Sequence, residues 1–105
     1  MRLQTKLIEN KLPSRLLSSK IVIKILEELV IDGPQTRTSL ARKTGSRYSK
    51  LVEYLDCLIN FGIVKEIKGG GARIYLINEE NPRSKIIKNF ILSWISLNDE
   101  IPHGC

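Results

Sequence analysis

Apolar residues recur at helical spacing along several stretches of the chain, and the first of these stretches covers 18–32. Its apolar positions lie three or four residues apart, which is the spacing of one face of an α-helix. Ser18 or Ser19 can cap the start of this helix, and Asp32-Gly33-Pro34 ends it. The predicted apolar face comprises Ile21, Ile25, Leu26, Leu29 and Val30.

Two further helices are predicted to meet at a turn around Gly45. Residues 38–44 form two helical turns with Thr38 as N-cap, and Gly45 ends them because glycine adopts the left-handed conformation without strain. Ser46 is then predicted to cap a third helix that runs to Gly62. The apolar face of this helix comprises Leu51, Leu55, Leu58 and Ile59.

Beyond the third helix the pattern changes to β-prone runs. Residues 63–68 and 72–77 are rich in β-branched and aliphatic side chains, and Gly69–Gly71 between them allow a tight turn, so we expect a β-hairpin. A polar break over 78–82 precedes a fourth predicted helix, 83–98. The apolar residues of this helix are Ile87, Phe90, Ile91, Trp94 and Leu97.

The two ends of the chain carry weaker signals. Residues 1–17 mix basic and aliphatic side chains around a proline, so a short helix, a strand and a flexible arm all remain open. Residues 99–105 contain a proline and a glycine and are predicted to be a flexible tail. At 105 residues the chain can bury a single core but not a separate catalytic domain. The expected fold class is α+β, with one mainly α domain and a small β-hairpin over 18–77, then a C-terminal helix within 78–98.

The chain is basic, with 17 lysines and arginines against 11 aspartates and glutamates and a formal net charge of +6. The positive charge is concentrated in two stretches. Residues 1–20 hold five basic residues against one acidic residue, and residues 33–75 hold eight against three. A balance of this kind favours polyanionic partners such as nucleic acid.

The residue types that metal sites and enzymes need are scarce. Cys57, Cys105 and His103 do not have metal-ligand spacing, so we expect no metal, and the two cysteines give no reason to expect an oxidising compartment. No nucleophile is paired with a histidine, and Gly69–Gly71 lies between strands, not at a helix start as a phosphate loop would. No apolar run reaches the roughly 20 residues that cross a bilayer, and no signal-peptide pattern is seen. We expect a cytoplasmic, nucleoid-associated protein without a cofactor, membrane segment or enzymatic activity.

Three segments carry a resemblance to a known family. They are 38–45, which reads Thr-Ser-Leu-Ala-Arg-Lys-Thr-Gly, the stretch 55–64, and the glycine turn 69–71. In 55–64 two leucines three positions apart precede a glycine, an aliphatic residue and a valine. With the order helix, short strand, helix, turn, helix and hairpin, these segments resemble the winged helix-turn-helix regulators of the broad MarR-like, ArsR-like and archaeal DNA-binding group over about 18–77. Asn60-Phe61 departs from the charged-small pair usual in that family.

The resemblance implies that the third helix, 46–61, enters the major groove of double-stranded DNA and that the hairpin, or wing, at 63–77 reaches the backbone or minor groove. The third-helix residues expected to contact DNA are Ser46, Arg47, Tyr48, Ser49, Lys50 and Glu53. Arg47 can pair with guanine or phosphate and Lys50 with phosphate, while Glu53 can accept from a cytosine amino group or repel phosphate. The alternative for these residues is an ordinary solvated helix face.

Further basic residues surround this helix. Lys68 and Arg73 flank the wing glycines, where they either straddle a phosphate or keep the hairpin edge soluble. On the preceding strand and helix, the residues expected to face the DNA backbone are Arg37, Arg42 and Lys43. Tyr48, at the start of the third helix, is expected to lie partly in the core.

The fourth helix is too apolar to be exposed, so it packs either on the chain's own first helix or on a second copy. We expect a homodimer, which would place two recognition helices on half-sites about one helical turn apart. The expected function is sequence-specific or architectural DNA binding, most simply as a transcription regulator. The alternative is a winged-helix protein-interaction module in a transcription, replication or division complex, which Glu53 and Asp56 on the third helix would suit. The use of fifteen isoleucines, ten lysines and only two glutamines is typical of an AT-rich or thermophilic, archaeal source.

Overall fold

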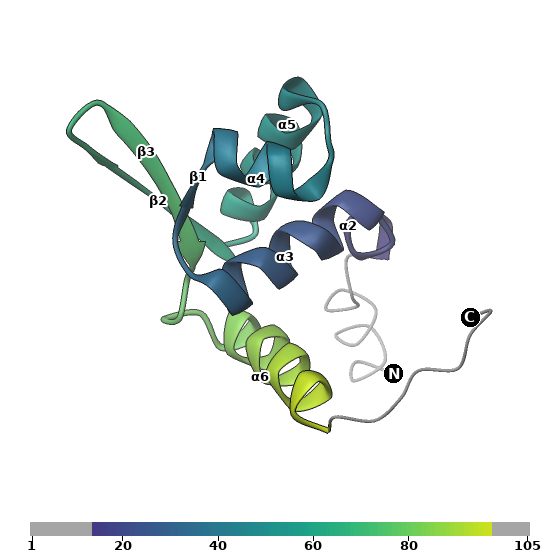
Figure 1. Ribbon diagram of the computed structural model, residues 1–105. Coiled ribbons are helices and arrows are strands. Elements are labelled where there is room, and N and C mark those ends of the chain that lie inside the picture. Colours follow the sequence, from purple (N-terminus) through teal and green to yellow (C-terminus); the bar gives the residue numbers. More distant parts are fainter. Residues whose placement is uncertain (1–13, 98–105) are drawn as a thin grey trace, which may run out of the picture.

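The computed structural model of the chain describes residues 14–97. Within them lie five helices and a three-stranded antiparallel sheet, which confirms the expected α+β class (Figure 1). In chain order the elements are α2 (Ser14–Leu17), α3 (Lys20–Asp32), β1 (Gln35–Thr36), α4 (Arg37–Thr44), α5 (Tyr48–Asn60), β2 (Val64–Gly69), β3 (Ala72–Ile77) and α6 (Pro82–Ser96). The segments 1–13 and 98–105, which include most of the predicted basic arm and the predicted tail, lie outside the described residues.

The first long helix, α3, has the caps that its sequence predicts. The Ser19 side chain accepts a hydrogen bond from the Val22 amide, and Gly33 ends the helix with a φ of 80°. The short helix α2 precedes it and buries Leu16 in the core. Of the alternatives left open for the N-terminal segment, the described part is therefore helical.

The N-cap of the next helix, α4, lies two residues earlier than predicted. Thr36 is its N-cap, with Oγ1 accepting a hydrogen bond from the Ser39 amide at 3.2 Å, so the assignment of Thr38 as cap is wrong. Thr36 takes this role because it lies in the extended backbone of β1, which is the conformation of an N-cap. Gly45 ends the helix in the left-handed conformation, as predicted.

The start of α5 also differs from the prediction. Ser46 does not cap this helix, because an extended Arg47 separates it from the first helical residue, Tyr48. The Ser46 hydroxyl instead lies 2.8 Å from the Thr44 hydroxyl at the end of α4. The turn between the two helices is thus closed by a hydrogen bond within the turn and leaves α5 without a side-chain cap.

The sheet has the strand order β1–β3–β2, and both pairings are antiparallel. β2 and β3 form the predicted hairpin, in a register that pairs Gly69 with Ala72, so that Gly70-Gly71 makes a two-residue turn with positive φ at both positions. The strand β1 consists of Gln35 and Thr36 alone and is the short strand of the expected element order, which residues 35–37 by themselves are too short to indicate. Its buried Gln35 side chain donates a hydrogen bond to the Glu28 carbonyl at 3.0 Å, which attaches this strand to α3.

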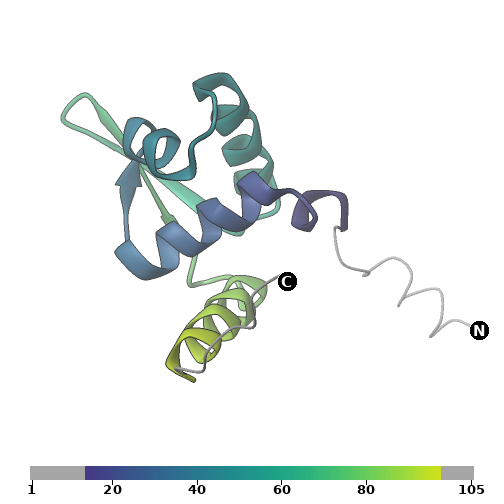
Figure 2. The same cartoon turned by 45° about the vertical axis from the view of Figure 1, so that its right-hand side comes forward.

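Helix α3 lies at the centre of the fold. α4, α5 and the sheet pack on one side of it and α6 packs on the other, and the hairpin tip and the start of α5 lie at the opposite end of the molecule from α6 (Figure 1, Figure 2). The buried core comprises Leu16, Val22, Ile25, Leu26, Leu29, Leu40, Leu51, Leu55, Leu58, Ile63, Val64, Tyr75 and Ile77.

Three side-chain hydrogen bonds attach the start of α6 to the base of the hairpin. The Ser84 hydroxyl is fully buried and donates to the Ile63 carbonyl at 3.0 Å. Asn78 and Asn81 both donate to the Gly62 carbonyl at 2.9 Å. Gly62 has a φ of 76°, and a Cβ at this position would lie 2.9 Å from Nδ2 of the Asn81 side chain, so glycine is required there. These contacts fix the place from which α6 leaves the sheet.

Candidate nucleic-acid interface

The outward face of α5 carries most of the residues that were predicted to contact DNA. Three leucines of this helix are buried as predicted, which leaves Ser49 and Glu53 exposed on the opposite side. Arg47 and Lys50 are also exposed near the helix start. Lys50 Nζ lies 3.7 Å from Glu53 Oε2. An ion pair between two exposed side chains is weak, so Lys50 can exchange Glu53 for another anion.

Tyr48 stands at the first position of α5 and is 52% exposed, so the expectation that it lies partly in the core is wrong. The helix starts at this residue, and side chains in a helix lean toward its N-terminus, which carries the ring away from the buried leucines. The hydroxyl of Tyr48, and after it that of Tyr75, raises the pKa of the Arg37 guanidinium. Tyr48 is therefore an exposed aromatic side chain beside a cation, at the tip of the helix.

Arg37, in the first turn of α4, is connected to the hairpin. Its Nε donates a hydrogen bond to the Tyr75 hydroxyl at 2.6 Å, and its guanidinium carbon lies 5.5 Å from the centre of the Tyr75 ring. The same hydroxyl donates to Glu66 Oε2 at 2.6 Å. Two guanidinium groups lie near that carboxylate oxygen, with Arg37 Nη2 at 3.8 Å and Arg73 Nη1 at 3.7 Å.

The charges in this network are fixed over the neutral pH range. Burial raises the pKa of Tyr75, and its hydrogen bond to Glu66 raises it further, so the phenol stays protonated. The hydrogen bond from Tyr75 lowers the pKa of Glu66, and the charge of Arg73 lowers it too. A neutral tyrosine thus joins a carboxylate to a guanidinium.

Lys43 points toward α3. Its Nζ lies 3.1 Å from Asp32 Oδ2 and 3.8 Å from Glu28 Oε1. The hydrogen bond from Lys43 lowers the pKa of Asp32, whereas burial raises the pKa of Glu28. Lys43 therefore already serves as a link between α4 and α3, while its neighbour Arg42 is exposed.

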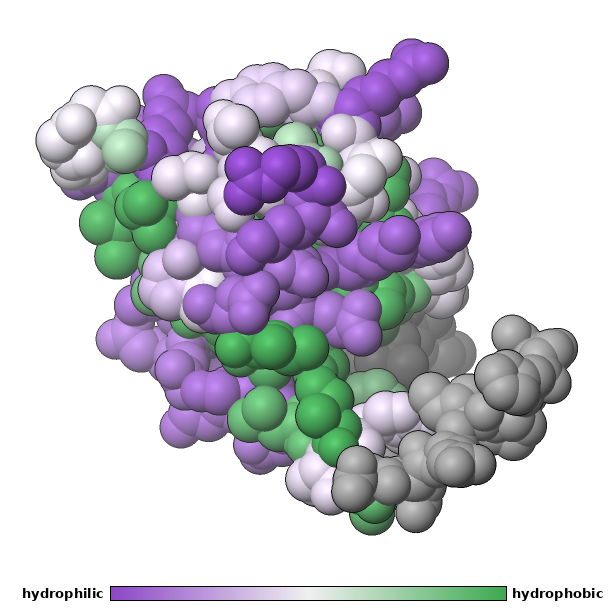
Figure 3. Space-filling model, in the orientation of Figure 1, coloured by the Kyte–Doolittle hydropathy of each residue, from purple (hydrophilic) through white to green (hydrophobic). Residues whose placement is uncertain are grey.

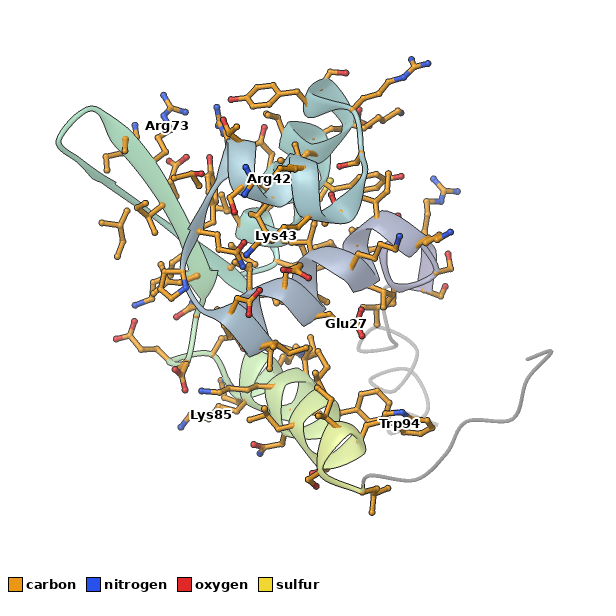
Figure 4. All side chains as sticks on the ribbon, in the orientation of Figure 1. Glu27, Arg42, Lys43, Arg73, Lys85 and Trp94 are labelled. Atoms are coloured by element: carbon orange, nitrogen blue, oxygen red, sulfur yellow. The ribbon has the colours of Figure 1, made fainter. Side chains whose placement is uncertain are left out.

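The hairpin presents its two predicted cations together. Lys68 and Arg73 are directly opposite each other in the β2–β3 register, so both side chains lie on one face of the sheet, and both residues are exposed. Glu66 and Tyr75 lie on that same face, two residues nearer the base of the hairpin. Figure 4 shows Arg73 on the hairpin at one end of the molecule and Trp94 on α6 at the other.

The end of the molecule that carries α6, opposite the hairpin tip, is apolar. Of the five residues predicted to form a dimer interface, Ile87 and Ile91 are half-buried and pack on the chain's own core, whereas Phe90, Trp94 and Leu97 are exposed. A groove of about 230 Å³ runs between α3 and α6, and its lining residues are Ile23, Glu27, Phe90, Ile91, Trp94 and Ile95. Figure 3 shows apolar side chains gathered over this part of the surface and hydrophilic ones over the region above it.

Neither a metal-binding cluster nor a membrane-spanning helix is found in residues 14–97. No cluster of three or more histidine, cysteine, aspartate or glutamate side chains there could hold a metal ion. No helix in the same range has the length and hydropathy to cross a membrane.

No protein-family model matches the chain, and no curated protein matches it. Solved structures do match. A predicted DNA-binding transcriptional regulator from E. coli has a TM-score of 0.68, covering 91% of this chain and 96% of that chain at 18% identity. The fold is a winged helix. The antimony-specific transcriptional repressor AntR has a TM-score of 0.63 at 20% identity, covering 79% of this chain and 73% of that one.

A MarR family transcriptional regulator from Silicibacter pomeroyi DSS-3 also has a TM-score of 0.63, at 14% identity, and covers 80% of this chain and 60% of that chain. At these identities the matches establish the winged-helix fold alone, in which the β2–β3 hairpin is the wing. They agree with the resemblance carried by the sequence.

Two residues that contact the predicted arginines, Glu66 and Tyr75, could not be singled out from the sequence. The period of two along a strand places Glu66 on the same face as Val64, and Tyr75 on the same face as Arg73, so part of the signal was present. The sequence does not indicate the register between the two strands, because three consecutive glycines permit more than one turn position. The contact with Arg37 was also hidden, since that residue lies 38 positions before Tyr75.

Proposed function

We propose that this chain binds double-stranded DNA as a transcription regulator, with the start of α5 in the major groove and the wing on the backbone or minor groove. The observation that carries the proposal is the exposure of Arg47 and Lys50 at the start of α5. The start of this helix lies at the same end of the molecule as the wing, which carries Lys68 and Arg73 (Figure 1). Basic side chains placed on a helix and an adjacent hairpin suit a duplex, because they reach phosphates on both sides of a groove.

The solved structures with this fold support the same function. The three solved structures reported above are named as transcriptional regulators or repressors, and one of them as predicted to be DNA-binding. The alternative role as a protein-interaction module would be suited by the acidic residues of α5. Glu53 Oε2, however, lies 3.7 Å from Lys50 Nζ, so that lysine balances the charge of Glu53 in the free protein, and Arg47 gives the start of α5 a net positive charge.

The test compares two double variants that remove the same charge from opposite ends of the molecule. Arg47→Ala/Lys50→Ala alters the start of α5, and Lys85→Ala/Lys88→Ala alters α6. Measured by fluorescence anisotropy on a labelled mixed-sequence duplex, the first variant is expected to weaken binding by about tenfold or more. The second is expected to change it far less. Equal losses would show that binding follows net charge alone, and no binding by the wild type would favour the protein-interaction module.

We further propose that the protein is a homodimer and that the second copy covers the exposed row of α6. Phe90, Trp94 and Leu97 are each more than 60% exposed, and Ile86 is 67% exposed in the same row. A contiguous apolar surface of this kind marks an interaction site. Ile87 and Ile91 pack on the chain's own core, whereas within residues 14–97 the remaining row is left exposed. Because α6 lies opposite the wing, a dimer would leave both DNA-facing surfaces uncovered.

Light scattering tests the dimer. The wild type is expected at twice the 12.0 kDa mass of one chain. Phe90→Glu places a charge in the exposed row and is expected to give the mass of a single chain, whereas Asn89→Glu places the same charge at an exposed polar position of the same helix and keeps the dimer. A wild-type mass of 12.0 kDa at micromolar concentration would contradict the proposal.

A further inference from the structure

Two arginines from separate elements converge on one carboxylate beside the wing. Arg37 comes from the start of α4 and Arg73 from β3, and their Nη atoms lie 3.8 Å and 3.7 Å from Glu66 Oε2. These separations are those of ion pairs and exceed the length of a good N–H···O hydrogen bond. Each guanidinium therefore keeps hydrogen-bond donors that Glu66 does not use.

Tyr75 holds this arrangement in place. Its side chain is fully buried, its hydroxyl accepts from Arg37 and donates to Glu66, and both of these hydrogen bonds are 2.6 Å long. The Arg37 guanidinium also lies over the Tyr75 ring. A buried, rigid phenol thus fixes the positions of the carboxylate and of one guanidinium without adding charge.

The position of the carboxylate is the position that a bound anion would take. Arginine recognises carboxylate and phosphate by the same planar set of donors, so an arginine pair that surrounds a carboxylate oxygen is also suited to a phosphate oxygen. The side chain of Arg73 is 49% exposed, whereas those of Arg37 and Glu66 are about one-fifth exposed, so the site opens to solvent on the Arg73 side.

We propose that Arg37 and Arg73 form a clamp for one DNA backbone phosphate, and that Glu66 is the internal anion that occupies this clamp in the absence of DNA. The proposal rests on the proposed DNA-binding function and adds a regulatory element to it. Glu66 weakens the attraction of the wing to any polyanion. Only a phosphate that α5 places correctly displaces the Glu66 carboxylate from the two arginines. The site would thereby reduce non-specific binding, which depends on phosphate contacts alone.

The test compares Glu66→Gln with Glu80→Gln. The first removes the clamp anion but keeps an oxygen that can accept from Tyr75. The second removes the same charge from the turn after β3, where Glu80 pairs with Lys65 at 2.9 Å. On a labelled mixed-sequence duplex at low salt, Glu66→Gln is expected to tighten binding about threefold to tenfold, and Glu80→Gln to leave it nearly unchanged. The salt slope is expected to steepen by up to about one unit in Glu66→Gln.

A double-mutant cycle separates the clamp from a general effect of charge. Combined with Arg73→Ala, the Glu66→Gln substitution is expected to lose at least half of its gain, because one arm of the clamp is missing. The full gain in that background, or equal gains for Glu66→Gln and Glu80→Gln, would overturn the clamp. Wild-type binding that Glu66→Gln does not alter would overturn the clamp alone, whereas absence of DNA binding by both proteins would overturn the proposed function with it.

Discussion

The hydroxyl of Tyr75 offers the sharpest test of the packing beside the wing. Tyr75→Phe removes one oxygen atom, keeps the ring in the core, and breaks two hydrogen bonds of 2.6 Å, one from Arg37 and one to Glu66. Hydrogen bonds to charged groups contribute about 1.5–3 kcal/mol each. Because both partners are about one-fifth exposed and water can replace the phenol, we expect a total loss of about 1–2 kcal/mol.

This loss is measured by urea and thermal denaturation. In a domain of this size each kcal/mol corresponds to about 4–8 °C in Tm. Tyr54→Phe is the matched control, because it removes a phenol from a half-buried site where no hydrogen bond of the hydroxyl is seen within 14–97. A loss in Tyr75→Phe no larger than that in Tyr54→Phe would refute the reasoning.

The same substitution has a predicted pH dependence. Tyr75 lowers the folded-state pKa of Glu66 below its ordinary value of 4.5. A carboxyl whose pKa is lowered on folding stabilises the protein above its unfolded pKa, and this stabilisation is lost as the pH falls through the folded pKa. The stability difference between wild type and Tyr75→Phe is therefore expected to be full at pH 7 and to shrink below about pH 4. A difference that stays constant down to pH 3 would show that Glu66 contributes nothing to it.

Two further pairs of substitutions test the backbone. Gly62→Ala places a Cβ 2.9 Å from Nδ2 of the Asn81 side chain at a backbone φ of 76°, so we expect the free energy of unfolding in urea to fall by about 1–3 kcal/mol. Gly69→Ala meets open space and is expected to cost less than 1 kcal/mol, and equal costs would contradict this. Thr36→Ala is expected to cost about 1 kcal/mol through the lost cap and Thr38→Ala about half a kcal/mol or less, so the reverse order would restore the sequence-based assignment.

The helices and the hairpin could be predicted from local sequence patterns, because the folded chain buries the residues that these patterns mark as apolar. The buried positions of α3 and α5 are those at which apolar residues recur every three or four positions, and Gly45 adopts the left-handed conformation expected of it. The errors in the helix caps arise because two neighbouring hydroxyl side chains can each cap a helix. Thr36 and Thr38 are equally good caps in isolation, and only the pairing of Gln35–Thr36 with β3 decides between them, which is a contact across almost 40 positions.

The candidate site was predictable in part for a related reason. The exposure of Arg47 and Lys50 follows from the apolar face of their own helix, so local periodicity was sufficient. The partners of Lys43 and Arg37 lie on other elements. No local sequence pattern therefore predicts that Lys43 pairs with Asp32 or that Arg37 donates to Tyr75. The division of α6 into a packed row and an exposed row likewise depends on where the Gly62 turn directs the helix.

The central claim, that this winged helix binds DNA through α5 and the wing, is tested most directly by the salt dependence of wild-type binding to a labelled duplex. The basic residues available at that surface are Arg37, Arg42, Arg47, Lys50, Lys68 and Arg73. Engagement of four to six phosphates predicts that log K falls against log salt with a slope of about −3.5 to −5.5 per protomer. A slope near zero, or no binding at 50 mM salt, would contradict the claim.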